Sequence, residues 1–566
     1  MIRYEKFQPL DNARLALNYL TSMVDERYDN LPFWRVAPHV YPAFAKHCRV
    51  DDAELVASWY EGLSAARAML GTDDGAQVQE SFRRHLMKSW GEQGLRFHQP
   101  YPWSYTIHSS FHEMAYVLSA LNRLLLDRPD DREAERRAAG LVRGLRSLVI
   151  QRQVRTFWCG DFEEADPLYE FPNDVYLAGR GFDLTRHTGR GEQPIRNGAM
   201  LRPLVVRWER TGDEVALDLA RGIANHLLGV SRYFNYRMEF FGHVHSAVWV
   251  ASGLVRLGRL TGESRYLAKG KAIFDYVRSL SSSFGWVPEF AQWHPMTEEH
   301  TETCCIKDMI ECAGELIDAG HEECWEVLNL FARNQLVENQ IKSGGFVACD
   351  NTLQDTVDET FRDIDRRVVG GFSGGAEPNS ISLKRFRAVA GCCIGTAPQA
   401  LEMVWDRAIS YGRGRVTVNL PVDKRTPAAA VAMGYPNEGR IAVTARRDCD
   451  VAIRLHPWMG AGVAGFVNGR QRRFRREGGL AVFDRVPRGA TVELRHPLRA
   501  RRVKEWARAR TFTVIWRGPD VVDILPRGAH IRLYQRVEGA RKLYPRPSKQ
   551  RGREPGFVAA PTQQKQ

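Results

Sequence analysis

The chain has 566 residues, more than one hydrophobic core usually supports, so we expect two large domains. Hydrophobic residues make up 44%, which is typical of a globular protein; ten cysteines are too few for a disulfide scaffold, and no apolar run is long enough to cross a membrane. The formal net charge of +13 comes from two basic regions in the C-terminal part, and the rest of the chain is slightly acidic.

The first 411 residues follow a helical pattern. Apolar residues recur at helical spacing, and glycine turns interrupt them at Thr211-Gly212, Thr261-Gly262 and Ala319-Gly320. A helical hairpin that recurs about every fifty residues is typical of a toroid, in which paired helices close into a double ring. We therefore predict an (α/α)6 toroid over residues 1–411. Other helices are predicted at 52–70, 109–126, 132–154 and 397–411.

From about residue 412 the pattern changes to strands. Short segments alternate polar and apolar residues with a period of two, and Gly and Pro turns separate them, as in an antiparallel β-sandwich. These segments are 415–420, 440–445, 450–455, 480–483, 490–494 and 511–516. We predict that the toroid is followed by an antiparallel β-sandwich over residues 412–544, and then by a disordered basic tail over residues 545–566.

Both basic regions lie in this second half of the chain. The balance of Lys and Arg over Asp and Glu is +10 for residues 470–510 and +6 for residues 541–566. A nucleic-acid-binding protein would combine such charge with aromatic residues on a recognisable binding module. We therefore expect a solvated basic face and no nucleic-acid partner.

Four of the ten cysteines occur as two adjacent pairs near the start of predicted helices. Cys304 and Cys305 follow Glu302, and Cys392 and Cys393 follow a glycine. Adjacent cysteines seldom form a disulfide with each other, because the closure is strained. Three thiolates and one carboxylate suit zinc, and a thiolate beside zinc at a helix N-terminus is available as a nucleophile. The spacing alone fits equally well with buried cysteines that act as small apolar residues.

The sequence Glu302-Thr-Cys304, followed by Gly391-Cys392-Cys393, resembles the motifs of the β-L-arabinofuranosidase family, glycoside hydrolase family 127. Gly242-His243, at the start of the helix that ends at Thr261-Gly262, agrees with this resemblance. The resemblance covers most of the helical region and is consistent with a sandwich behind it. It implies that the zinc ligands are Glu302, Cys304, Cys392 and Cys393, and that Cys392 attacks the anomeric carbon of the sugar.

The general acid/base is the point where this sequence departs from that family. Relatives have a Gly-Glu pair about sixteen residues before the metal-binding glutamate, and Trp286 stands at that position here. Glu289 is the nearest carboxylate, so we predict it as the acid/base, with Glu298 or Glu299 as alternatives. Ala199 stands near the place of a sugar-binding histidine in relatives, which puts the arabinofuranose specificity in question.

Three further residues are candidates for contact with the sugar. His243 and His245 begin a predicted helix and could touch sugar hydroxyls, and Trp286 could stack on the sugar because it flanks Glu289. A structural role in the core is the alternative for each of them.

These observations predict a retaining glycoside hydrolase with a zinc-bound cysteine nucleophile. Two other functions stay open: a sugar epimerase or isomerase on the same toroid, which would use a histidine pair and need no zinc, and a non-catalytic carbohydrate-binding protein with a structural zinc. We expect a carbohydrate as the partner and no membrane; whether the chain forms a homodimer stays open. We also expect a cytoplasmic location, because the N-terminus lacks the apolar run of a signal peptide.

Overall fold

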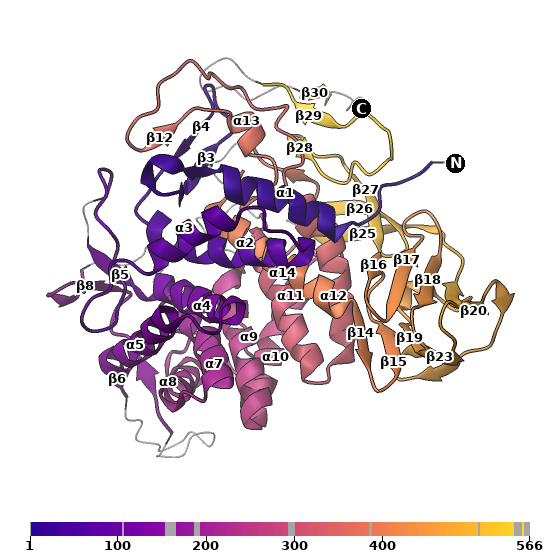
Figure 1. Ribbon diagram of the computed structural model, residues 1–566, viewed down its shortest axis with the longest axis horizontal. Helices are drawn as coiled ribbons and strands as arrows, with labels where there is room; N and C mark the ends of the chain where they lie inside the picture. The colour runs from indigo at the N-terminus through magenta and orange to yellow at the C-terminus, as the bar shows by residue number, and fades with distance from the viewer. Residues whose placement is uncertain are drawn as a thin grey trace.

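The computed structural model describes residues 2–104, 107–152, 166–185, 193–292, 300–383, 388–507, 510–547 and 557–559. A helical part comes first in the chain and a β-rich part follows it (Figure 1). Within the described residues, no helix combines the length and the apolar character that crossing a membrane requires.

The helical part contains most of the helices, and six of them form a continuous series of contacts. Contacts run from α2 to α4, α7, α9, α11 and α14, and α14 returns to α2. Other helices pack against members of this series, such as α1 against α2, α5 against α4, α8 against α7 and α10 against α9. The helices are α1 (Pro9–Ser22), α2 (Val56–Leu70), α3 (Ala76–Leu86), α4 (Phe111–Asp127), α5 (Arg132–Leu148), α6 (Gln193–Arg196), α7 (Leu201–Thr211), α8 (Glu214–Asn225), α9 (Val244–Thr261), α10 (Ser264–Leu280), α11 (Thr303–Asp318), α12 (Trp325–Phe331), α13 (Ile364–Arg367) and α14 (Gly391–Arg407).

Short strands join these helices. Several of them pair across large distances in the sequence, so that the loops between helices are tied together. The strands are β1 (Val24–Asp25), β2 (Leu31–Pro32), β3 (Arg35–Ala37), β4 (Phe44–Lys46), β5 (His108–Ser110), β6 (Ile150–Gln151), β7 (Tyr169–Glu170), β8 (Val175–Leu177), β9 (Gly181–Phe182), β10 (Gly242–His243), β11 (Phe290–Ala291), β12 (Glu359–Thr360) and β13 (Ser380–Ile381).

The glycine turns occur where the sequence predicted them. Gly212 and Gly262 follow α7 and α9 with φ of 69° and 77°, the left-handed conformation that glycine adopts without steric cost. The side chain of Asp213 then caps α8 by accepting hydrogen bonds from the backbone N–H of Val215 and Ala216. The third turn also follows its helix, since α11 ends just before Ala319 and Gly320 has a φ of 95°.

The bounds of two predicted helices were wrong, and a third helix has the predicted extent but a different first turn. The helix predicted at 52–70 opens with one π-helical turn, Asp51–Leu55, before α2. The helix predicted at 132–154 ends at Leu148, where the chain turns into β6. The helix predicted at 397–411 begins at Gly391 and ends at Arg407, because Pro398 lies inside the helix and does not mark its start.

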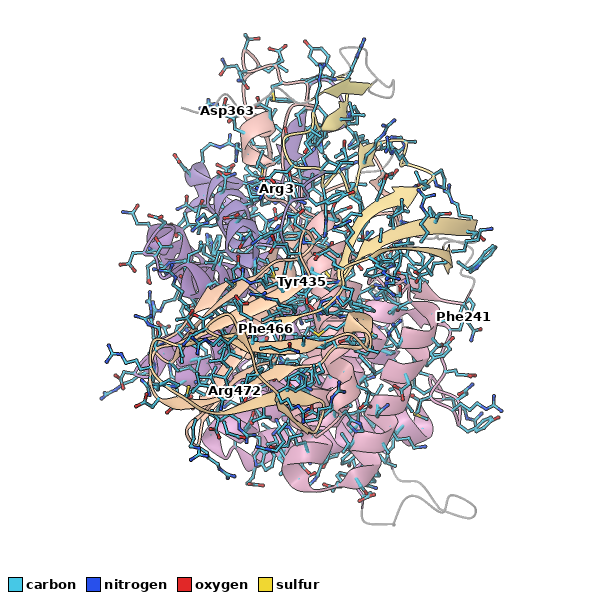
Figure 2. All side chains as sticks on the ribbon, turned by 90° about the vertical axis from the view of Figure 1, so that its right-hand side faces the viewer. Arg3, Phe241, Asp363, Tyr435, Phe466 and Arg472 are labelled. Atoms are coloured by element: carbon cyan, nitrogen blue, oxygen red, sulfur yellow. The ribbon has the colours of Figure 1, made fainter. Side chains whose placement is uncertain are left out.

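The β-rich part contains two larger sheets. Their strand orders are β14-β15-β19-β23-β22 and β16-β17-β18-β24-β20-β21. The expectation of a wholly antiparallel arrangement was wrong at one place, because β15 and β19 are parallel. Figure 2 shows these strands in front of the helices. The strands are β14 (Ile409–Gly412), β15 (Arg415–Val418), β16 (Lys424–Arg425), β17 (Ala429–Met433), β18 (Arg440–Ala445), β19 (Cys449–Arg454), β20 (Ala464–Val467), β21 (Arg470–Gln471), β22 (Arg475–Glu477), β23 (Leu480–Val486) and β24 (Thr491–Arg495).

A third sheet and two strand pairs complete the β-rich part. Strands β25, β26 and β27 form an antiparallel sheet, β28 pairs with β13, and β29 pairs with β30. Since β30 lies inside the predicted disordered tail, the prediction of disorder was wrong for Phe557–Ala559; residues 548–556 and 560–566 of that tail lie outside the described residues. The strands are β25 (Ala500–Ala507), β26 (Arg510–Arg517), β27 (Asp520–Leu525), β28 (Ile531–Arg532), β29 (Leu543–Pro545) and β30 (Phe557–Ala559).

A buried ionic cluster joins the two parts of the chain. Arg333, which follows α12, donates hydrogen bonds of 3.1 and 3.0 Å to the two carboxylate oxygens of Asp520 on β27. Arg536 donates to Asp520 at 3.3 Å and to Glu338 at 2.9 Å. Arg333 and Asp520 are fully buried, so each depends on the other for the hydrogen bonds that water would otherwise supply.

Replacing Asp520 by Ala is expected to lower the free energy of unfolding by about 3–5 kcal/mol, because it leaves two buried arginines without their shared carboxylate. Chemical denaturation followed by circular dichroism measures the change. The matched control is Asp484→Ala, which removes a half-exposed partner of Arg475 and is expected to change the free energy by less than about 0.5 kcal/mol. Equal effects of the two variants would contradict this role for Asp520.

Candidate functional site

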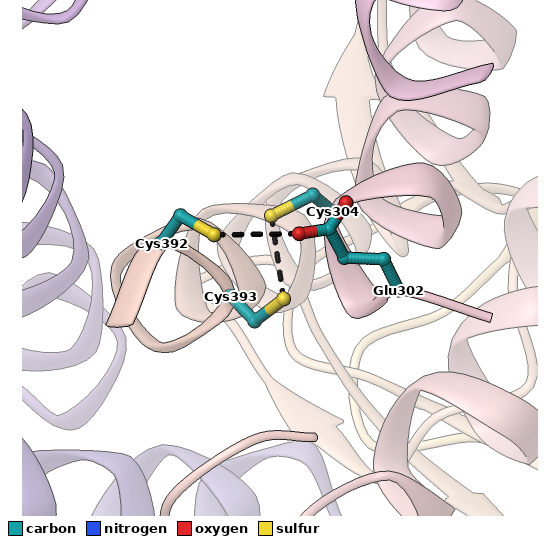
Figure 3. A group of neighbouring side chains, drawn as sticks. All are labelled: Glu302, Cys304, Cys392 and Cys393. Atoms are coloured by element: carbon teal, nitrogen blue, oxygen red, sulfur yellow. Dashed lines mark hydrogen bonds between the residues drawn. The ribbon is translucent and has the colours of Figure 1, made fainter. Parts of the chain in front are cut away.

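Two helix N-termini bring the predicted zinc ligands together. Glu302 is the N-cap residue of α11 and Cys304 lies in its first turn, while Cys392 and Cys393 lie in the first turn of α14. Because α11 packs against α14, the four side chains meet, although about ninety residues separate the two motifs (Figure 3). The sequence therefore placed these four residues correctly at helix starts, and the helix packing brings them into one cluster.

The separations within this cluster fit a single metal ion. Cys304 Sγ lies 3.4 Å from Cys393 Sγ, and Cys392 Sγ lies 3.5 Å from Glu302 Oε1. Ligand atoms of all four residues lie within 4.8 Å of one another. Tetrahedral zinc would set two sulfurs about 3.8 Å apart and a sulfur and an oxygen about 3.5 Å apart, given bonds of about 2.3 and 2.0 Å. Three thiolates and one carboxylate are also a donor set that zinc favours.

The cluster is buried, and this makes its charge state depend on a cation. Cys304 and Cys393 are fully buried, whereas Cys392 is half-buried. Burial raises the pKa of the Cys304 and Cys393 thiols well above the usual range, and the hydrogen bond with Cys304 raises the pKa of Cys392. A bound divalent cation would stabilise the thiolate forms of all three residues.

The imidazole of His243 lies within hydrogen-bonding distance of the Glu302 carboxylate. Its Nε2 lies 3.3 Å from Glu302 Oε2, and its Nδ1 lies 2.7 Å from the hydroxyl of Ser246. A histidine that bonds the second oxygen of a metal-binding carboxylate fixes the orientation of that ligand. His243 was predicted to contact the sugar; the structure places it against Glu302, and it is not among the described residues that line the neighbouring cavity.

Glu289, the predicted acid/base, lies close to the same centre. Its carboxylate is within 4.8 Å of ligand atoms of His243 and Glu302, and it forms an ion pair with His300. Glu289 is 1% exposed and is not among the described residues that line the cavity. The alternatives Glu298 and Glu299 lie outside the described residues.

Trp286 is a core residue in this structure. It is 3% exposed, and its indole N–H donates to the backbone carbonyl of Ala376 at 3.2 Å. It is not among the described residues that line the cavity, so the structure gives no support to the predicted stacking on a sugar. Trp286 and Glu289 lie in the same loop, as the sequence shows. Trp286 is buried because this loop packs against the segment around residue 376.

A cavity of about 260 Å³ opens beside Cys392. This volume is near the lower end of the range for small-molecule sites. Of the predicted site residues, Cys392, Glu302 and His245 line it. The backbone of Arg35 forms a bridge to Ala390, which places Trp34 and Arg35 beside the nucleophile candidate. The remaining lining residues are Trp34, Arg35, Arg49, Val50, Glu54, Ser110, His112, Glu113, Tyr116, Ile195, Val389, Ala390 and Gly391.

His245 is held in the cavity wall by three neighbours. Its Nδ1 forms an ion pair with Asp308, its Nε2 lies 3.2 Å from the Tyr116 hydroxyl, and its ring stacks on Trp249. Burial opposes protonation of this imidazole, but the charge of Asp308 outweighs that effect and raises the pKa of His245. The predicted role of His245 in contacting the sugar is compatible with this position.

Sequence reasoning missed two carboxylates in the cavity wall. Glu113 lies in the first turn of α4, and Glu54 lies in the π-helical turn before α2. The start of a helix is the same local signal that pointed to Glu302, so Glu113 could have been found by it. A π-helical turn often marks a functional site, but it cannot be read from the sequence.

A second histidine and carboxylate cluster adjoins Glu113 and has a different character. His98, His108 and Glu113 have ligand atoms within 4.8 Å of one another. However, His98 Nε2 lies 2.5 Å from Glu113 Oε2, closer than the roughly 3.3 Å expected for two ligands of one zinc ion. The direct hydrogen bond therefore explains the closeness of His98 and Glu113 without an ion.

Comparison with known proteins establishes a relationship of fold. No model of a protein family and no curated protein matches the sequence. Solved structures similar to this chain include glycoside hydrolases. One is a family 127 β-L-arabinofuranosidase from Geobacillus stearothermophilus T6, with 14% identity, a TM-score of 0.52 and coverage of 91% of this chain and 80% of that chain.

Two further solved structures extend this comparison. A second family 127 β-arabinofuranosidase has 14% identity and a TM-score of 0.56, and the match covers 92% of this chain and 83% of that chain. A structure described as a glycoside hydrolase has 15% identity and a TM-score of 0.53, with 89% and 85% coverage. At these identities the likeness shows a shared fold, and the function has to be argued from the site.

Proposed function

We propose that the protein is a retaining glycoside hydrolase whose nucleophile is a zinc-bound Cys392. One observation carries the proposal: Cys392 belongs to a four-residue set spaced for zinc and also lines the cavity. The fold of the family 127 enzymes and the resemblance of the two cysteine motifs support it. In this proposal the series of helix contacts is an (α/α)6 toroid, and the two larger sheets form a β-sandwich.

In the first step, Cys392 Sγ attacks the anomeric carbon of a sugar in the cavity, and the bond to the leaving oxygen breaks. In this proposal Glu289, as a carboxylic acid, donates its proton to that oxygen; since Glu289 is buried and is not among the described residues that line the cavity, the step requires its loop to move toward the cavity. In the second step, Glu289 accepts a proton from water, the water oxygen attacks the anomeric carbon, and the carbon–sulfur bond breaks. When bound, zinc would keep the Cys392 thiol ionised and therefore a good leaving group.

The experiment is a screen of aryl furanosides and aryl pyranosides, with an NMR assignment of the first anomer formed. We expect hydrolysis of at least one glycoside with retention of the anomeric configuration, since two displacements restore it. Inversion would contradict a covalent intermediate on Cys392, and the absence of any hydrolysis would contradict the proposed reaction.

Glu289→Gln is expected to slow cleavage of glycosides with poor leaving groups by about 10²–10⁴-fold, because the leaving oxygen then departs without a proton. Aryl glycosides with acidic leaving groups should be affected less in the first step. Steady-state kinetics on a series of leaving groups measures the difference. The matched control is Glu326→Gln, which alters another glutamate–histidine pair, with His456, on α12. A Glu289→Gln variant with unchanged dependence on the leaving group would reject this assignment.

A sugar epimerase or isomerase is the second candidate. Two histidines, His112 and His245, line the cavity and could serve as the acid and the base. This function needs no zinc and predicts that the protein converts a free sugar into an isomer, which NMR detects. The third function, binding without catalysis, is less well supported, because Cys392, a potential nucleophile, lines the cavity.

A further inference from the structure

A chain of three buried charged side chains runs from the π-helical turn to the cavity wall. Asp52 Oδ1 lies 2.8 Å from His98 Nδ1, and His98 Nε2 lies 2.5 Å from Glu113 Oε2. The three residues are 1%, 2% and 5% exposed. Each nitrogen of the imidazole therefore has one carboxylate partner, and the mechanism above uses none of the three residues.

Contacts with the backbone hold this series of three side chains in place at its Asp52 end. Asp52 Oδ2 accepts a hydrogen bond of 2.9 Å from the backbone N–H of Gln99 and lies 3.4 Å from Arg96 Nη2. The backbone N–H of His98 donates to the carbonyl of His108 at 2.9 Å. With both ends of the Asp52–His98 contact tied to the backbone, the imidazole presents Nε2 to Glu113 in a fixed direction.

The Glu113 end of this series of three side chains lies in the wall of the cavity. Glu113 lines the cavity together with Cys392 and Glu302, whereas Asp52 and His98 are not among its described lining residues. Burial opposes the charge on His98, but Glu113 and Asp52 outweigh it and raise the pKa of His98 to about 10. His98 thus holds the Glu113 side chain in place where it reaches the cavity.

We propose that Glu113 binds hydroxyl groups of the sugar in the cavity, and that Asp52 and His98 are positioning residues for it. This inference rests on the proposed function. Carboxylate oxygens accept hydrogen bonds, and a sugar offers hydroxyl donors on neighbouring carbons. Three carboxylates, Glu54, Glu113 and Glu302, line the cavity with two arginines, Arg35 and Arg49. This balance favours a neutral sugar over a uronic acid or a sugar phosphate.

The neighbouring residues provide a matched control chain. His47 Nδ1 lies 2.8 Å from Asp51 Oδ2, and His47 Nε2 lies 3.2 Å from Asp25 Oδ2. This chain has the same chemistry and comparable burial, but none of its three residues is among the described lining of the cavity. Variants of Asp51 and His47 therefore measure the structural cost of disturbing such a chain.

The experiment compares Glu113→Gln, Asp52→Asn and His98→Gln with Asp51→Asn and His47→Gln. Kinetics on the best aryl glycoside are measured together with zinc content and melting temperature. Glu113→Gln is expected to lower kcat/KM by about 10- to 100-fold, the size expected for losing a hydrogen bond to a charged group. Asp52→Asn should act in the same direction but less, and Glu113→Asp should restore part of the activity. Asp51→Asn and His47→Gln should keep kcat/KM within about twofold.

Binding of free monosaccharides, measured by calorimetry, separates this inference from the proposed function. Galactose and arabinose are compared with glucuronic acid, and we expect the neutral sugars to bind more tightly and to lose affinity in Glu113→Gln. If the wild type binds a sugar without hydrolysing any glycoside, and Glu113→Gln weakens that binding, the inference holds while the proposed reaction fails. The inference would be overturned by an unchanged kcat/KM in Glu113→Gln or by tighter binding of glucuronic acid than of the neutral sugars. Equal losses of kcat/KM in the Asp52–His98 variants and in the Asp51–His47 variants would also overturn it.

Discussion

Cys392→Ser is expected to lower kcat/KM for every glycoside that the protein hydrolyses by at least about a thousandfold. A serine hydroxyl is far less acidic than a thiol, so it supplies almost no nucleophilic anion at neutral pH. The fold should survive, because Cys392 is half-buried at the cavity and the substitution changes one atom. Steady-state kinetics and a thermal melt of the same preparation measure both effects.

The matched control for this variant is Cys312→Ser. Cys312 lies on α11, two turns beyond Cys304, and is fully buried. It should lose some stability and keep its activity. Zinc content is measured for both variants, because loss of the ion would by itself remove activity. A Cys392→Ser variant that retains zinc and the wild-type rate would show that another group is the nucleophile.

Purified protein is expected to contain about one zinc ion per chain, and the Cys392→Ala, Cys393→Ala double variant should contain none. Two of the four ligands are removed, and the remaining pair cannot satisfy the preferred coordination of zinc. Loss of the ion should also lower stability, since a ligand present at a thousand times its Kd stabilises the native state by about 4 kcal/mol. Elemental analysis and denaturation with and without a chelator measure these effects.

A second double variant, Cys312→Ala, Cys324→Ala, controls for the loss of buried sulfur, since neither residue belongs to the four-residue set. It should keep its zinc and its response to the chelator. Folded wild-type protein that binds no zinc would remove the cysteine mechanism. The function would then have to be sought among the histidines and carboxylates of the cavity.

Much of the four-residue cysteine–glutamate cluster could be predicted from short sequence motifs. The two cysteine motifs lie in or next to the first turn of a helix, and helix starts depend mainly on neighbouring residues. The predicted glycine turns were confirmed for the same reason, because a left-handed residue after a helix is a local requirement. The start of α14 was misplaced by six residues, since the helix begins at Gly391 and includes Pro398 in its interior.

The identity of the residues that line the cavity could not be predicted in this way. His243, Glu289 and Trp286 lie in sequence beside residues of the centre, but all three are buried around it and are absent from the described cavity lining. Glu54 and Glu113 come from segments about 190 to 340 residues before the cysteine motifs. The π-helical turn before α2 carries Glu54 and α4 carries Glu113, and they reach the cavity only when the helices pack.

The sequence by itself determined the change from helices to strands, which follows from periodicity, and the four candidate ligands, which the resemblance of the two cysteine motifs to a known family implied. The tertiary structure decided which helix ends face each other, which carboxylates reach the cavity and which are buried behind the ligands. Those outcomes depend on contacts between residues far apart in the chain, where packing and the need to pair buried charges outweigh local preference.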